Sequence, residues 1–343
     1  MNRRHPAEWE KQRAVWLAWP HNVKEWRADR LPRIRQFVRT LIETVLEFQD
    51  VRLALTDEGM RSDIAPILRA LRPHACLPVV IPNNDIWIRD YGPFFVESES
   101  PAPRPPLVLD FGFNAWGEKF PPWDLDDIFP SAAARSLGLE IERRSMILEG
   151  GSVEFSGDGI LMTTEQCLLN PNRNPGMDRA GIEQELKSAF GVEAFVWLRR
   201  GLDGDHTDGH IDDIARFVGP RTVLACRCND SRDSNFDRLA ENIDILRRWR
   251  HPKTDETLAV IEIPMPHRMD LGPNRLPNSY VNFIFVNGGL IVSTFGGETD
   301  AVALDILRGL FPDRRVVGID STLLIEEGGG LHCMTKQEPL PSP

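Results

Sequence analysis

Cysteine is scarce in this chain of 343 residues. The five cysteines, Cys76, Cys167, Cys226, Cys228 and Cys333, are scattered and odd in number, which argues against a disulfide framework. We therefore expect reduced thiols. The Cys226-x-Cys228 pair has no partner pair at zinc-finger spacing, so we interpret it as part of a strand.

Long apolar runs are missing as well. No stretch approaches the roughly 18 consecutive apolar residues of a membrane-spanning helix, and residues 1–11 have no apolar segment after their two arginines. The sequence therefore predicts neither a membrane segment nor a signal peptide. A cytoplasmic location is the default expectation that follows.

An excess of positive charge is also absent. The chain has 40 basic and 51 acidic residues and a net charge of −11. Nucleic acids and anionic membranes favour surplus lysine and arginine, so we expect neither as a partner. A small cationic substrate is compatible with this sign of charge.

Strand and helix patterns recur along the chain in five units. Apolar residues spaced by three and four over 34–46 predict a buried helix face between strands at 14–20 and 51–55. An amphipathic stretch at 57–71 and a strand at 77–81 complete this first unit. A hairpin, a helix and a strand are then predicted in each of four later units: 91–142 with a Pro-rich hairpin tip at 99–106, 152–198, 214–263, and 281–319 with an Asn-Gly-Gly turn at 287–289.

Repeats of this length predict an α/β array in which no unit buries its apolar face alone. Asp90, Glu149, His210 to Asp212 and Cys333 each follow the last strand of a unit or lie in the link to the next. A closed ring of units would bring these residues to one axis, so we predict one domain over 1–343. An ordinary α/β sandwich is the alternative.

The chemistry centres on a glycine run at 328–330 that is followed by Cys333. A thiol is mostly protonated at neutral pH and needs a nearby base or positive charge to act as a nucleophile. His210 is the candidate base, and Glu149 can orient it or bind the substrate. Asp90 and Asp212 are suited to a planar cation, because carboxylates accept guanidinium hydrogen bonds in pairs. These residue types predict a cysteine-dependent hydrolase of guanidino compounds.

A metal-dependent hydrolase is the rival interpretation. His206, Asp208, His210 and Asp212 alternate, and an extended segment would place all four on one side as metal ligands. Under that hypothesis Cys333 would have no role.

Several motifs together resemble the agmatine deiminase and bacterial (Porphyromonas-type) peptidylarginine deiminase family of the guanidino-group-modifying superfamily. The resemblance covers nearly the whole chain. The motifs, in chain order, are Pro6–Glu10, Val15–Pro20, Asn84–Pro93, Gly112–Gly117, Leu148–Ser152, Leu168–Pro175, Gly209–Asp212 and Gly328–Cys333.

The resemblance implies a pentein fold, which is a five-bladed pseudo-symmetric α/β propeller of ββαβ-type repeats, with no metal and no cofactor. It implies that Cys333 attacks the guanidinium carbon and forms a covalent amidino-thioether, while Asp90 and Asp212 hold the nitrogens. His210 with Glu149 would protonate the departing ammonia and then activate water. Three further candidate substrate-binding residues stand in these motifs: Asp85, Trp87 and Trp116.

The substrate expected from the resemblance is agmatine, with N-carbamoylputrescine as the product and a place in putrescine formation. Agmatine-specific members differ from this chain at Tyr91, Asp208 and Gly330, so free or peptide-terminal arginine is the alternative substrate. A homo-oligomer is expected.

Overall fold

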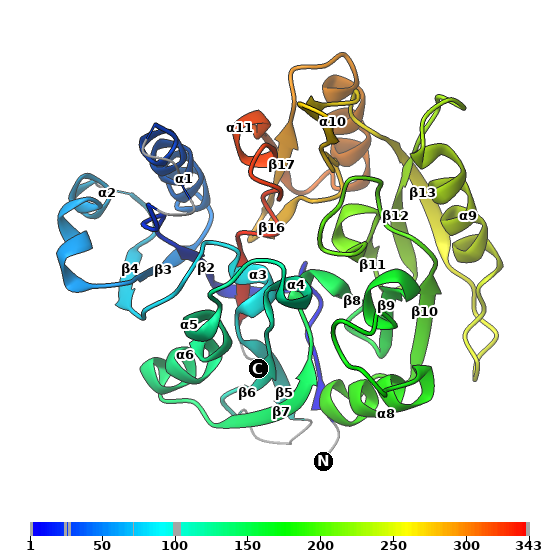
Figure 1. Ribbon diagram of the computed structural model, residues 1–343, viewed down its shortest axis with the longest axis horizontal. Helices are drawn as coiled ribbons and strands as arrows, with labels where there is room; N and C mark the ends of the chain where they lie inside the picture. The colour runs from blue at the N-terminus through cyan, green and yellow to red at the C-terminus, as the bar shows by residue number, and fades with distance from the viewer. Residues whose placement is uncertain (1–2, 24–25, 27–28, 71, 99–103, 341–343) are drawn as a thin grey trace.

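Five sheets of three or four strands and one small hairpin make up the mixed α/β fold of this computed structural model, which describes residues 3–23, 26, 29–70, 72–98 and 104–340. Two short helices, α3 (Ile88–Tyr91) and α4 (Ala115–Glu118), lie near the centre of the view in Figure 1. Longer helices surround them at the rim: α1 (Leu31–Val45), α6 (Phe129–Leu137), α8 (Arg179–Phe190), α9 (Asn235–Arg248) and α10 (Thr299–Leu310).

The first unit follows the predicted order of strand, helix and strand. Its parallel strands are β2 (Gln12–Ala18), β3 (Asp50–Leu55) and β4 (Cys76–Val80). The apolar face of α1 is buried, as its spacing predicts. The expected helix at 57–71 is instead a 3-10 turn (Glu58–Ser62) followed by the short helix α2 (Ala65–Arg69), with a proline at its start. Residue 71 lies outside the described residues.

The end of the chain returns to this first sheet. Strand β19 (Lys336–Pro339) pairs antiparallel with β2, so that Lys336 lies opposite Trp16. The indole Nε1 of Trp16 also donates to Glu338 Oε2 at 3.1 Å. Strand β19 therefore joins the sheet that residues 12–80 form, a pairing that the sequence pattern did not predict.

The other four units follow the predicted hairpin, helix and strand plan in the part of the chain that the structure describes. In each, the first two strands pair antiparallel and the third pairs parallel with the second. Residues 99–103 of the expected hairpin tip lie outside the described residues. The strands are β5 (Phe94–Ser98), β6 (Leu107–Gly112) and β7 (Ile141–Ile147); β8 (Val153–Phe155), β9 (Ile160–Thr164) and β10 (Ala194–Leu198); β11 (Ala215–Gly219), β12 (Thr222–Arg227) and β13 (Ala259–Pro264); and β16 (Ile284–Val286), β17 (Gly289–Thr294) and β18 (Arg315–Asp320).

Shorter elements join these units. Strand β1 (Arg3–Arg4) pairs with β5, while β14 (Asp270–Leu271) and β15 (Asn274–Arg275) form the separate hairpin. The remaining helices are α5 (Asp124–Asp127), α7 (Glu165–Leu168) and α11 (Thr322–Ile325). The strand expected from residue 281 begins only at Ile284, so Asn282 lies in the preceding loop. That loop position matters for the site described below.

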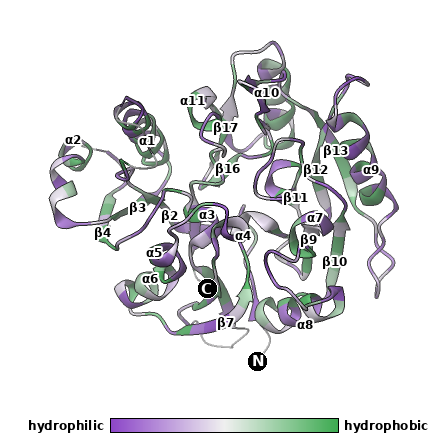
Figure 2. Cartoon of the chain, in the orientation of Figure 1, coloured by the Kyte–Doolittle hydropathy of each residue, from purple (hydrophilic) through white to green (hydrophobic). Residues whose placement is uncertain are grey.

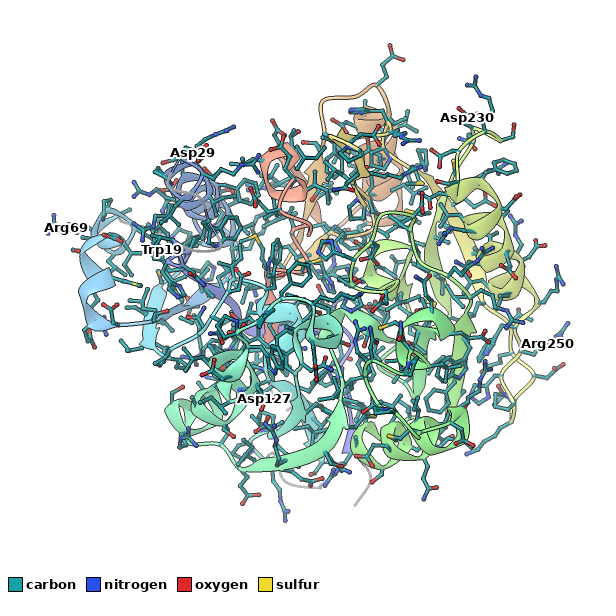
Figure 3. All side chains as sticks on the ribbon, viewed as in Figure 1. Trp19, Asp29, Arg69, Asp127, Asp230 and Arg250 are labelled. Atoms are coloured by element: carbon teal, nitrogen blue, oxygen red, sulfur yellow. The ribbon has the colours of Figure 1, made fainter. Side chains whose placement is uncertain are left out.

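Apolar side chains of the strands and of the inward helix faces form the core. Figure 2 shows hydrophobic colour along much of the strands and mixed colour along the rim helices. Charged side chains such as Arg69, Asp230 and Arg250 lie at the edge of the view in Figure 3. No helix of the described residues is long and apolar enough to cross a membrane.

The links between units carry the chemistry-bearing residues. Each link follows the last strand of a sheet and places a polar group near the centre. Asp90 follows β4, Glu149 follows β7, His210–Asp212 follow β10, Asn282 follows β13 and Cys333 follows β18. Every one of the five units therefore contributes to one region.

Candidate active site

Five of the residues predicted from the sequence line a single cavity of about 210 Å³: Asp85, Trp87, Asp90, Trp116 and Cys333. The other three, Glu149, His210 and Asp212, are buried behind Asp90 and Cys333. The structure therefore brings all eight candidates together. Aromatic residues that were not predicted also form its walls: Trp26, Phe113, Phe120 and Trp123.

Cys333 presents its thiol to the floor of this cavity. Its Sγ lies 3.3 Å from Asn282 Nδ2 and 3.9 Å from Asp212 Oδ2. Burial, together with the nearby carboxylate of Asp212, raises the pKa of the thiol well above its ordinary value. Without a bound cation the side chain of Cys333 is therefore a thiol, not a thiolate.

The glycine run before Cys333 allows a close approach to an aromatic wall. A Cβ on Gly329 would lie 2.4 Å from Cζ3 of Trp87, which is closer than real Cβ contacts. Any side chain at this position would therefore displace the indole. Glycine is needed here because the chain must pass directly against the wall of the cavity.

Asp90 is held at the floor by two donors. Its Oδ1 accepts from the Gly151 amide at 2.8 Å and its Oδ2 accepts from Trp116 Nε1 at 2.8 Å. Trp116 belongs to a left-handed turn, with φ of 57°, and such strain persists where surrounding contacts hold it. A Cβ on Gly151 would lie 2.6 Å from His210 Nδ1 and 2.9 Å from Asp90 Oδ1. The backbone at Gly151 therefore packs directly against the reacting groups.

His210 and Asp212 approach each other through a 3-10 turn (Ile211–Asp213) rather than along the extended segment that the sequence analysis assumed. His210 Nδ1 lies 3.8 Å from Asp90 Oδ1 and 4.0 Å from Asp212 Oδ1. Burial alone would lower the pKa of His210, but Asp90, Cys167 and Glu149 together outweigh burial, and the pKa is raised well above its ordinary value. The imidazole is therefore protonated and can act as a general acid.

Glu149 is fully buried beside His210. Its Oε1 accepts from Arg173 Nε at 2.6 Å. One ligand atom each of Glu149, Cys167 and His210 lie within 4.8 Å of one another. Glu149 Oε2, Asp212 Oδ1 and His210 Nε2 have no hydrogen-bond partner. Unpaired buried acceptors cost free energy, and these two carboxylate oxygens keep the capacity to accept hydrogen bonds from N–H donors.

The metal site of the rival interpretation does not form among the described residues. Asp208 has a φ of 70° and forms ion pairs with Arg173 and Lys119, while His206 lies on the cavity wall with its ring 5.4 Å from that of Phe120. Among the described residues, possible ligands gather as Glu149, Cys167 and His210, or as Asp212, Asp213 and Cys333. The alternating segment does not converge because it turns at Asp208.

Four residues of the site were not assigned a role from the sequence. Asn282 donates to Asp213 Oδ1 at 2.9 Å and accepts from the His332 amide at 2.9 Å, which fixes the loop that carries the nucleophile. Arg173 holds Glu149, and His332 bridges Asp212 and Glu8. Glu8, Arg173 and His332 lie inside the motifs, which was their only signal in the sequence, whereas Asn282 lies outside all of them.

Comparison with known proteins agrees with this geometry. The family model described as Porphyromonas-type peptidyl-arginine deiminase matches residues 4–339. A Pseudomonas putida protein named agmatine deiminase is 36% identical over 366 aligned residues, which cover 98% of this chain and 95% of that protein.

Two solved structures are similar over almost their whole length. The agmatine deiminase of C. jejuni, solved with substrate bound, is 31% identical with a TM-score of 0.89, covering 99% of this chain and 97% of that one. The agmatine deiminase of Enterococcus faecalis is 28% identical with a TM-score of 0.90, covering 98% of this chain and 96% of that one.

Proposed function

This chain belongs to the Porphyromonas-type peptidyl-arginine deiminase family, and we propose that it hydrolyses agmatine to N-carbamoylputrescine and ammonia. One observation carries the proposal: the thiol of Cys333 lies 3.9 Å from Asp212 Oδ2, and Cys333 and Asp90 line the same cavity. A nucleophile among carboxylates is suited to an electrophilic carbon that bears positive charge. The names of its relatives support the same reaction.

The guanidinium group is bound by the buried carboxylates. Asp212 Oδ1 and Glu149 Oε2 lack hydrogen-bond partners, and a guanidinium brings N–H donors arranged in a plane. Asp90 lies opposite at the cavity floor. The indoles of Trp87 and Trp116 line the remaining space and pack against the methylene chain of the substrate.

In the first half-reaction the bound cation favours the thiolate of Cys333, and the thiol proton passes to solvent. The sulfur forms a bond with the guanidinium carbon. Protonated His210 then gives its proton to one nitrogen, the carbon–nitrogen bond breaks, and ammonia leaves. The enzyme is left with an amidino-thioether on Cys333 and a neutral His210.

In the second half-reaction neutral His210, oriented by Glu149, takes a proton from water. The water oxygen attacks the amidino carbon, and the carbon–sulfur bond breaks. The ureido product leaves and Cys333 is regenerated. Water enters only after ammonia has departed, because both use the position between the carbon and His210.

Charge in the cavity favours agmatine over arginine. The carboxylates of Asp85 and Glu327 line the cavity, and no lysine or arginine does so among the described lining residues. The primary ammonium of agmatine would face these carboxylates favourably, whereas the α-carboxylate of arginine would not. Free or peptide-terminal arginine is therefore the weaker second candidate.

The architecture that serves this function is, we propose, a five-bladed pentein propeller acting as one catalytic domain over 1–343. Five sheets with the same mixed pairing support it, as does the contribution of every link to the site. The pairing of β19 with β2 joins the end of the chain to the first sheet, as a closed ring requires.

Ammonia release from agmatine, arginine and a short arginine-ending peptide tests the function, with wild-type and Cys333→Ala proteins compared side by side. We expect turnover of agmatine that requires Cys333 and is unaffected by a chelator. A folded wild-type protein that releases no ammonia from agmatine would refute the substrate. Activity retained in Cys333→Ala would refute the mechanism.

A further inference from the structure

A buried imidazole joins two carboxylates directly beneath the nucleophile. His332, the residue before Cys333, is 1% exposed. Its Nδ1 lies 2.7 Å from Asp212 Oδ2 and its Nε2 lies 2.8 Å from Glu8 Oε2. Each ring nitrogen therefore lies within hydrogen-bonding distance of one carboxylate oxygen. The arrangement is a carboxylate, an imidazole and a carboxylate in series.

The far end of this series is firmly anchored. Glu8 Oε2 also accepts from Arg216 Nη2 at 2.8 Å and lies 3.6 Å from Arg89 Nη2. Burial would raise the pKa of Glu8, but the charge of Arg216 and its other cationic neighbours outweigh burial and hold this pKa well below its ordinary value. Glu8 therefore stays ionised and can fix the orientation of the His332 ring.

At the other end of the series, the contact between His332 and Asp212 determines which carboxylate oxygen of Asp212 is free to accept another hydrogen bond. His332 occupies Oδ2, while Oδ1 has no hydrogen-bond partner and lies 4.0 Å from His210 Nδ1. If the His332 ring were removed, the carboxylate would be free to rotate, and Oδ1 would lose its fixed direction. The other charged groups near Asp212 include Asp90, Asp213, Arg216, Arg89 and Lys336.

We propose that His332 is a positioning residue that fixes the Asp212 carboxylate so that Oδ1 points at the guanidinium, with Glu8 as its anchor. The proposal rests on the function proposed above. It assigns a purpose to two residues that do not touch substrate and lie 324 positions apart in the chain.

Alkylation of Cys333 by two small reagents tests this without requiring turnover. Chloroacetamidine carries an amidinium that Asp212 can bind, whereas iodoacetamide is neutral. Each reagent forms a carbon–sulfur bond with Cys333 and releases its halide. The measured quantity is the ratio of the two rate constants, read by mass spectrometry of the Cys333 peptide.

We expect His332→Phe, which keeps a ring but no donor, to lower this ratio by about 10- to 100-fold, the factor for a hydrogen bond to a charged group. His332→Asn restores one donor toward Asp212 and should recover part of the loss. Glu8→Gln keeps His332 in place, so its ratio should fall less. His251→Phe replaces another buried histidine, 8% exposed, that does not line the cavity, and should leave the ratio unchanged.

A double-mutant cycle separates positioning from general damage to the fold. On an Asp212→Asn background, His332→Phe should lower the ratio no further, because the carboxylate that it positions is already absent. Equal losses in both backgrounds, with unfolding midpoints that match those of wild type, would overturn the proposal. A wild-type ratio near one would refute amidinium binding itself and hence the proposed function. A high wild-type ratio that both His332→Phe and Glu8→Gln leave unchanged would refute only the role of His332.

Discussion

Asp212→Asn should make Cys333 more reactive toward neutral reagents while it lowers turnover. The carboxylate oxygen lies 3.9 Å from Sγ, and at an effective dielectric constant of about 20 this repulsion disfavours the thiolate by about 4 kcal/mol. That corresponds to about 1,000-fold in the equilibrium between thiol and thiolate. A less basic thiolate is also a weaker nucleophile, with a Brønsted coefficient of about 0.4–0.5, which leaves a net gain of about 30-fold.

The assay is the rate of iodoacetamide addition to Cys333 at neutral pH without substrate, followed by mass spectrometry so that the other cysteines do not contribute. Asp230→Asn, which changes an exposed carboxylate at the edge of the molecule (Figure 3), is the matched control. Ammonia release should fall in Asp212→Asn even as alkylation accelerates. An alkylation rate within about twofold of wild type would refute the view that Asp212 keeps the sulfur protonated.

Other consequences follow from the same contacts. Trp116→Phe removes the 2.8 Å donor to Asp90 Oδ2, so kcat/KM for ammonia release should fall by about tenfold; an unchanged value would refute that role. Arg216→Met leaves Glu8 short of a partner in the interior, and urea denaturation should show a loss of about 3–5 kcal/mol in unfolding free energy; an unchanged midpoint would contradict this. The raised pKa of His210 predicts that kcat falls as pH rises through it, since the general acid is lost. The stability contributed by the raised pKa of His210 should be complete below the ordinary histidine pKa of about 6.5 and lost as pH rises through the folded-state pKa; Asp90→Asn should move the loss of kcat and the loss of stability to lower pH.

Much of the fold was predictable because its units are local. A helix face repeats every three or four residues and a hairpin turn needs particular residues, so α1 and the β16–β17 turn at Asn287-Gly288 follow from short stretches of sequence. The family relationship predicted from the motifs is confirmed by the match over residues 4–339. The pairing of β19 with β2 was not predictable in the same way, because no local pattern relates Lys336 to Trp16.

The candidate site was predictable as a set of residues but not as a geometry. The segment from His206 to Asp212 alternates in sequence like a strand, yet the Asp205 carboxylate accepts from the amides of Thr207, Gly209 and His210 and closes it into a turn. Such side-chain capping overrides alternation. Asn282 was interpreted as a strand residue because it lies in an apolar run, and such a run does not show at which residue the hydrogen bonds between strands begin.

In the proposed mechanism, the protonation states of Cys333 and His210 explain how the site selects a cation. Cys333 has a raised pKa because it is buried among carboxylates, and His210 has a raised pKa because Asp90, Cys167 and Glu149 together outweigh its burial. The free protein therefore holds a thiol and an imidazolium, which is the inactive pair for attack but the correct pair for releasing ammonia. A guanidinium between the carboxylates offsets the repulsion that keeps the sulfur protonated. A neutral electrophile of the same size does not, so in the proposed mechanism the positive charge of the substrate both binds it and activates Cys333.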